Sequence, residues 1–96
     1  MGPSTRQAPA RELLEANHVF PGSYLIKAFG PANESFRAGV AEAISAAVGA
    51  RAQFSERSSS KGNSICITVE LAAQNVDEVL TAYERLHDVP ELKMIL

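Results

Sequence analysis

A turn of small polar residues that leads directly into an alternating stretch restricts the fold of this chain more than any other feature. Residues 58–63 read Ser-Ser-Ser-Lys-Gly-Asn, and apolar side chains then occupy every second position at Ile65, Ile67, Val69 and Leu71. Because successive side chains of a strand point to opposite faces, this pattern predicts a strand with one buried face. Gly62 and Asn63 are expected to supply positive φ angles in a hairpin that returns from an edge strand over residues 51–57.

Two helices are predicted from apolar side chains that recur at three- and four-residue steps. The first covers residues 33–48, with Asn33 as its N-cap, Gly49 at its end and Gly39 at a close helix-to-sheet contact. The second covers residues 76–87 and begins with a capping box between Asn75 and Glu78. Its polar face, with Asp77, Glu84 and Arg85, is expected to face solvent.

The remaining elements follow from composition and turn residues. Residues 23–29 are apolar on both faces apart from Lys27, which predicts a central strand buried on both sides. Residues 91–96 are expected to form a last strand with Leu92, Met94 and Leu96 on one face. Residues 1–10 are interpreted as a flexible tail and residues 11–16 as a short helical turn in which Leu13 and Leu14 touch the domain.

The resulting order is strand, helix, strand, strand, helix, strand. Right-handed crossovers place the first strand beside the third. We therefore predict an α+β fold for a single domain of residues 11–96. It is a ferredoxin-like βαββαβ two-layer sandwich, with a four-stranded antiparallel sheet of order 4-1-3-2 and two helices on one face.

Composition excludes several classes of function. The net charge is −2, which offers no basic footprint for nucleic acid, and no apolar run is long enough to cross a membrane. A single cysteine, Cys66, rules out an internal disulfide framework and suits a cytoplasmic location. His18 and His87 are distant in sequence and lack a patterned third ligand. We expect no metal, no cofactor and no enzymatic activity, because no acid–base pair or activated nucleophile is recognisable.

Several segments together resemble the YbeD-like family of small, functionally uncharacterised bacterial proteins. They are Glu-Leu-Leu-Glu at residues 12–15, Ser-Ser-Lys-Gly-Asn at residues 59–63, the strand at residues 64–69 and the ending Leu-Lys-Met-Ile-Leu at residues 92–96. The resemblance implies a fold similar to ACT-type regulatory domains, which bind amino acids, and a link to lipoate metabolism. The family often has two further residues, including a Tyr and a His, after the Asn of the turn. Asn63 here runs straight into Ser64.

Three sets of residues are candidates for function. The first is the strand-to-helix loop Gly30, Pro31, Ala32 and Asn33, which binds the ligand in ACT-like domains, although helix capping alone explains Asn33 and is the favoured interpretation. The second is the hairpin motif Ser59, Ser60, Lys61, Gly62 and Asn63, which could hold an anion but which turn chemistry alone accounts for. The third is a predicted interaction surface on the uncovered face of the sheet, formed by Leu25, Lys27, Phe29, Lys93 and Ile95.

We therefore favour a non-enzymatic regulatory or adaptor domain that contacts a protein partner or a second copy of itself. The alternative is an ACT-like sensor of an amino acid or related metabolite, linked to lipoate metabolism.

Overall fold

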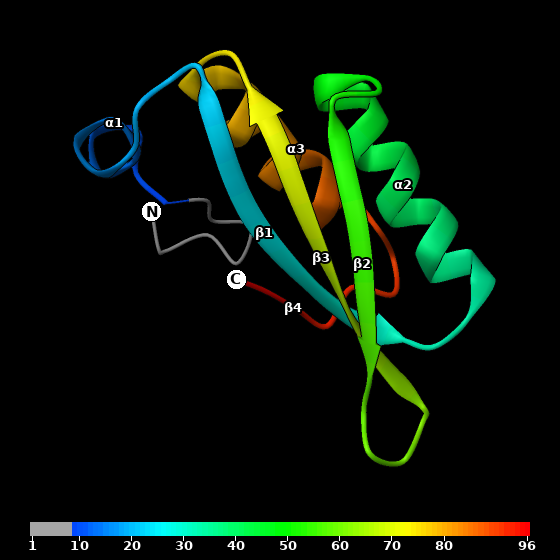
Figure 1. The fold of residues 1–96 in the computed structure, drawn as a ribbon. Helices are drawn as coiled ribbons and strands as arrows, with labels where there is room; N and C mark the ends of the chain where they lie inside the picture. The colour runs from blue at the N-terminus through cyan, green and yellow to red at the C-terminus, as the bar shows by residue number, and fades with distance from the viewer. Residues whose placement is uncertain (1–8) are drawn as a thin grey trace, which may run out of the picture.

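A central sheet with helices on one side organises the chain in a computed structural model that describes residues 9–96 (Figure 1). The helices are α1 (Arg11–Asn17), α2 (Glu34–Val48) and α3 (Val76–His87). The strands are β1 (Gly22–Pro31), β2 (Ala52–Ser58), β3 (Ser64–Ala73) and β4 (Met94–Ile95). Most of the predicted tail, residues 1–8, lies outside the described residues.

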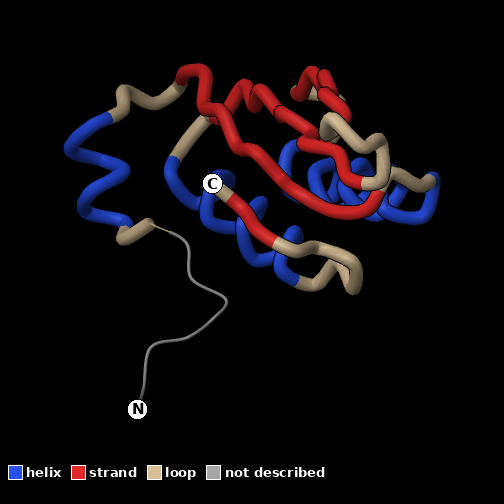
Figure 2. Tube along the Cα trace, turned by 90° about the horizontal axis from the view of Figure 1, so that it is seen from below, coloured by secondary structure: helices blue, strands red, loops and turns tan. Residues whose placement is uncertain are grey.

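The four strands are antiparallel and lie in the order β2-β3-β1-β4, which is the predicted order read from the other edge. The α+β class and the sheet topology are therefore confirmed, and the short helical turn predicted over residues 11–16 forms a third helix, α1. Figure 2 shows α2 and α3 on the same side of the sheet, and within residues 9–96 no helix covers the other side.

The buried core lies between the sheet and these two helices. Alternation in β3 is confirmed, since Ile65, Ile67, Val69 and Leu71 are all almost fully buried. Facing them are Phe36, Val40 and Ile44 of α2 and Val79, Tyr83 and Leu86 of α3. Tyr24 of β1 and Tyr83 join their buried hydroxyl groups at 3.0 Å, which satisfies both polar groups inside the core.

Both predicted N-caps are present. The side-chain oxygen of Asn33 accepts a hydrogen bond from the N–H of Phe36, and that of Asn75 accepts one from the N–H of Glu78. The second half of the predicted capping box differs, because the Glu78 carboxylate accepts from the N–H of Gln74 and not from that of Asn75.

Two predictions about packing were wrong. The first strand is central, but it is not buried on both sides: Ser23, Leu25 and Lys27 are exposed because the helices cover only one face. Gly39 does not approach the sheet, since a Cβ atom there would meet Cγ1 of Val89 at 3.0 Å, in the segment after α3. Its small size therefore lets that segment, and not a strand, come close to α2.

The two ends of the domain also differ from the predictions. In α1, Leu14 enters the core, whereas Leu13 points away from it. The last strand is shorter than predicted, because the N–H of Leu92 bonds to the carbonyl of Val89 and keeps residues 89–92 in a turn. Leu92 consequently packs against the core, while Met94 and Leu96 are exposed.

Candidate interaction surface

The uncovered face of the sheet is defined by the strand register. Residues that pair across antiparallel strands project to the same face. Lys27 of β1 pairs with Thr68 of β3, and Thr68 pairs with Ser55 of β2. Every second residue along each strand lies on this same face, so its composition can be read row by row from the pairing.

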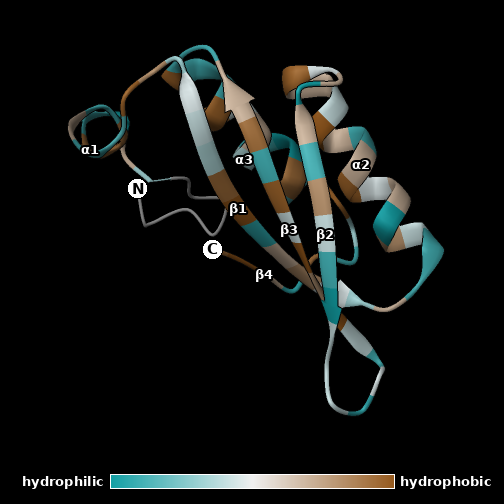
Figure 3. Ribbon diagram, viewed as in Figure 1, coloured by the Kyte–Doolittle hydropathy of each residue, from teal (hydrophilic) through white to brown (hydrophobic). Residues whose placement is uncertain are grey.

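The side of this face formed by β1 and β4 is apolar. Leu25, Met94 and Leu96 expose 57%, 49% and 62% of their surfaces, and Phe29 is half-buried beside Met94, its cross-strand partner. Lys27 lies among them, and its N–H and C=O exchange hydrogen bonds of 3.0 and 2.8 Å with Leu96. We call Leu25, Phe29, Met94, Leu96 and the central Lys27 the β1–β4 strip. Figure 3 shows the contrast between the brown end of β4 and the mostly pale and teal β2.

The side formed by β3 and β2 is polar. Cys66, Thr68 and Glu70 of β3 are followed outward by Arg57, Ser55 and Gln53 of β2. Glu70 accepts a 2.7 Å hydrogen bond from the Ser23 hydroxyl. Cys66 is partly buried between the positions of Phe29 and Arg57. The uncovered face is thus divided into an apolar and a polar half.

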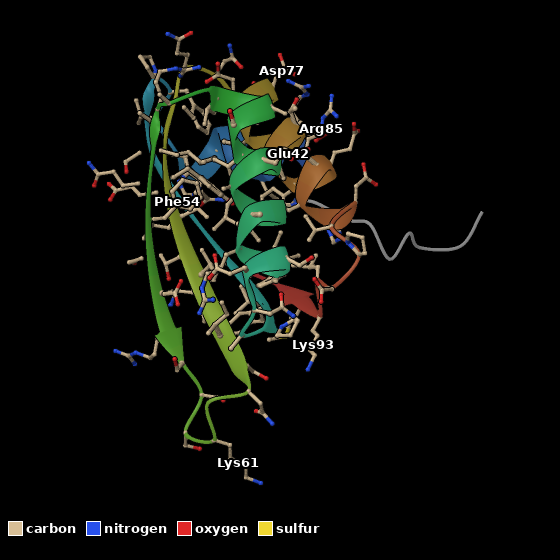
Figure 4. The ribbon with its side chains drawn as sticks, turned by 90° about the vertical axis from the view of Figure 1, so that its right-hand side faces the viewer. Glu42, Phe54, Lys61, Asp77, Arg85 and Lys93 are labelled. Atoms are coloured by element: carbon tan, nitrogen blue, oxygen red, sulfur yellow. The ribbon has the colours of Figure 1, made fainter. Side chains whose placement is uncertain are left out.

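Three of the five residues predicted for this surface lie on it, namely Leu25, Lys27 and Phe29. Ile95 does not, because it pairs with the fully buried Ala28 and packs against the core on the helix side. Lys93 donates its N–H to the carbonyl of Phe29 at 2.8 Å, and its side chain points away from the domain on the helix side of the sheet (Figure 4).

Met94 and Leu96 lie on the uncovered face instead of Ile95 and Lys93. Their alternation in the sequence placed them on one face, but it could not indicate which face, since that depends on the register with β1.

The predicted ligand loop and the hairpin motif are brought together. The N–H of Ala32 donates to the carbonyl of Asn63 at 3.3 Å, and that of Asn33 donates to the carbonyl of Pro31 at 2.9 Å. The side chain of Asn33 caps α2 and also donates to Glu91 at 3.1 Å. The main-chain N–H groups of Ala32 and Asn33 are therefore both already bonded within the domain.

Gly30 has a packing role in the same loop. A Cβ atom at this position would lie 2.5 Å from the ring of Phe36, which is fully buried. Contacts this short are incompatible with an unshifted ring. The absence of a side chain at Gly30 is therefore explained by the core alone.

Turn geometry accounts for the hairpin. The N–H of Gly62 bonds to the carbonyl of Ser59 at 2.9 Å, and Ser59 and Ser64 close the loop with a 2.8 Å bond. Gly62 has a φ of 76°, as predicted, whereas the prediction of a positive φ for Asn63 was wrong. A single left-handed residue suffices because hairpin loops longer than two residues are typically built around a type I turn, which needs only one such residue to close. Ser60 is exposed, and Lys61 points into solvent from the tip (Figure 4).

Charged side chains outside the uncovered face hold elements together. Arg37 of α2 bonds to both carboxylate oxygens of Glu56 on β2, at 3.0 and 3.2 Å from its Nε atom. Arg51 binds Glu78 at 2.6 Å. The hydrogen bonds from Arg37 and Arg51 hold the pKa of the Glu56 and Glu78 carboxyl groups below the usual range. Burial raises the pKa of Tyr83. On the outer side of the helices, Glu42, Asp77 and Arg85 point away from the sheet, as predicted for Asp77 and Arg85 (Figure 4).

A shallow pocket of about 460 Å³ lies at the end of the sheet where β1 begins. Its lining combines Gly22, Ala50, Ala52 and Ala72 with a few polar groups. Of these, Glu70 is bonded to Ser23 and Arg51 to Glu78. Three of the polar side chains that line the pocket, Ser23, Glu70 and Arg51, are thus already bonded within the domain.

Within residues 9–96, no three His, Cys, Asp or Glu side chains come close enough to hold a metal ion. His18 instead stacks edge-on against Tyr24, with 4.8 Å between ring centroids. No helix of this described part is long and apolar enough to cross a membrane.

Comparison with known proteins places the chain in a family. No curated protein matches it. Residues 15–96 match the family described as "Protein of unknown function (DUF493)", to which the YbeD-like proteins belong, so the resemblance noted in the sequence is confirmed. The chain belongs to this family.

Proposed function

We propose that this protein is a non-enzymatic regulatory or adaptor domain that acts by contact with another protein. The observation that carries the proposal is the β1–β4 strip, where Leu25, Met94 and Leu96 are each about half exposed or more on the face that α2 and α3 leave uncovered. Contiguous exposed apolar side chains on a sheet typically mark a site of association. Lys27 within the strip would orient a partner through a carboxylate or a carbonyl group.

The fold is consistent with this role. The element order β1, α2, β2, β3, α3, β4 supports a ferredoxin-like arrangement, preceded by the additional helix α1. An open sheet of this kind leaves one face free for contact, as in domains similar to the ACT type. We place the protein in the cytoplasm because of its single unpaired cysteine.

The alternative, a sensor of an amino acid or a lipoate-related metabolite, has less support. It needs free main-chain donors in residues 30–33, but those of Ala32 and Asn33 are bonded to Asn63 and Pro31. Binding a ligand there would first require these bonds to break.

Site-specific photo-crosslinking tests the proposal. A benzoylphenylalanine residue replaces Met94 in the strip or, as the matched control, Ser55 on the polar half of the same face. We expect a defined protein adduct from position 94 and not from position 55. The captured protein is then purified, and its affinity is measured by calorimetry for the wild type and for Met94→Ser.

Loss of the exposed apolar side chain should weaken binding by about tenfold, since partial burial of such a group contributes about 1.4 kcal/mol or more. Met94 is half exposed, so the substitution should leave the melting temperature unchanged within about 2 °C. The proposed role of the strip would be refuted if the wild type and Met94→Ser bound the partner with equal affinity, or if positions 94 and 55 crosslinked equally.

A further inference from the structure

The outer edge of β1 is only half covered by β4. Pairing on this side includes Ala28 with Ile95 and Phe29 with Met94, and it ends with the two hydrogen bonds between Lys27 and Leu96. Within the described residues, no strand pairs with the outer side of β1 from Gly22 to Ile26. The sheet therefore has an open edge beside its own last strand.

The register shows which main-chain groups this edge presents. In an antiparallel ladder, alternate residues direct their N–H and C=O groups to opposite neighbours. Lys27 directs both groups to β4, and the pairing of β1 with β3 is continuous from Gly22 to Pro31. Ser23 and Leu25 therefore also direct their groups outward, where residues 9–96 provide them with no hydrogen-bond partner.

Residues 22–26 lack three of the features by which proteins commonly prevent strand addition. Such edges usually carry charged residues, prolines or bulges. Residues 22–26 of β1 are Gly-Ser-Tyr-Leu-Ile, with no charge, no proline and no break in register. The edge strand on the other side of the sheet, β2, carries Glu56 and Arg57. The two edges are therefore not equivalent.

Exposed apolar side chains also gather on the β1 side. Among the exposed large hydrophobic residues of the described part of the chain, only Phe54 lies on β2, and the others are Leu13, Val19, Leu25, Met94 and Leu96. Val19 is the most exposed, at 86%, and lies in the segment that joins α1 to β1. Figure 1 shows α1, this segment and β4 on the same side of β1.

We infer that the β1 edge from Gly22 to Ile26 accepts an extended peptide segment of a partner protein, uncharged along the residues that pair, which adds to the sheet as a strand. The inference rests on the proposed function and specifies its partner. Main-chain groups of Ser23 and Leu25 bond to the backbone of the segment, as in other cases of strand addition. Every second side chain of the segment would project to the uncovered face beside Leu25 and Leu96. Contact with these two residues favours apolar side chains at those positions.

A second copy of this chain fits the edge less well. A two-fold pairing of β1 with itself, centred on Tyr24, would place Pro21 of one copy opposite Lys27 of the other. Leu96 already pairs with Lys27 at that place. A separate peptide segment can end before it reaches the place that Leu96 occupies beside Lys27. A second copy of the chain cannot, because its Pro21 is joined to its β1.

The test uses the full chain, labelled with ¹⁵N, and three eight-residue peptides. Each has lysine at both ends, threonine at alternate inner positions and valine, leucine or phenylalanine at the others. With at least one peptide, we expect saturable amide shifts over residues 22–27. Hydrogen exchange at the N–H groups of Ser23 and Leu25 should slow by about tenfold or more. The same peptide with alternate amides N-methylated should not bind, because it cannot complete the ladder.

Two variants locate the binding edge. Leu25→Lys places a charge on the β1 edge and should weaken binding by about tenfold or more. Phe54→Lys makes the same kind of change at the opposite edge and should leave binding unchanged. Both residues are about half exposed, so the two variants should melt close to the wild type.

Other outcomes would overturn the inference. Slow exchange at Ser23 and Leu25 in the free chain would show that the edge is already occupied, by the chain itself or by a second copy. Shifts confined to β2, or no binding by any peptide, would also contradict it. Shifts at Phe29 and Met94 without slower exchange at Ser23 and Leu25 would exclude strand addition but leave the proposed function standing. The proposed function fails separately if Met94→Ser binds the crosslinked partner as tightly as the wild type.

Discussion

Replacing Gly30 with alanine should destabilise the domain strongly, although the change adds only one methyl group. A Cβ atom at this position would lie 2.5 Å from Cε1 and Cζ of Phe36 and 2.8 Å from Cδ1. The Phe36 ring is fully enclosed by the core and cannot move away without displacing its neighbours. Overpacking of this kind costs about 2–3 kcal/mol. For a domain of this size, the melting temperature should fall by roughly 10–20 °C.

A double-mutant cycle with Phe36→Leu tests the cause. Phe36→Leu alone should cost about 1–2 kcal/mol because it leaves a cavity. Combined with Gly30→Ala, it gives the new methyl group room, so the double variant should be at least about 1 kcal/mol more stable than the sum of the single effects predicts. The free energy of unfolding is measured by urea denaturation followed by circular dichroism.

Gly39→Ala is the control, because its Cβ would meet only the side chain of Val89, at 3.0 Å or more, and alanine favours the helix. Its effect should therefore be small. A fully stable Gly30→Ala variant, or strictly additive effects in the cycle, would refute the steric explanation.

Three further predictions concern single interactions. Since Arg51 lowers the pKa of Glu78 in the folded state, the ion pair stabilises the fold above the unfolded pKa and loses this effect as the pH falls. Urea titrations from about pH 5 to 3 should therefore show a steeper loss of stability for the wild type than for Glu78→Gln. Tyr83→Phe leaves the buried hydroxyl of Tyr24 without its partner and should cost about 1–2 kcal/mol in the same titrations, while adding Tyr24→Phe should cost little more. Gly62→Ala should cost about 1 kcal/mol because φ there is 76°, and an unchanged melting temperature would argue against this turn geometry.

The sequence predicted the sheet order because the pattern of each long element was clear. Alternation marks β3 without ambiguity, and Asn33 and Asn75 begin the helices at the predicted positions. With the elements in place, the handedness of strand-helix-strand crossovers leaves few arrangements. The topology could therefore be derived without knowing any tertiary contact.

The surface was harder to predict because it depends on register and on packing between distant segments. Ile95 and Met94 are adjacent and both apolar, and only the pairing of Met94 with Phe29 shows which of them is exposed. Nothing local in the sequence indicates that Gly39 meets Val89. A strand of two residues carries too short a pattern to fix its own register.

A comparison of two amide NMR titrations of the ¹⁵N-labelled chain separates contact through the β1–β4 strip from metabolite sensing. One uses the purified partner captured by crosslinking, and the other uses a panel of amino acids and lipoate-type metabolites. We expect the partner to shift the amides of Leu25, Lys27 and Met94, while the metabolites leave residues 30–33 unchanged. Saturable metabolite shifts confined to residues 30–33, with no response of the β1–β4 strip to the partner, would contradict the proposed adaptor role and establish a sensor.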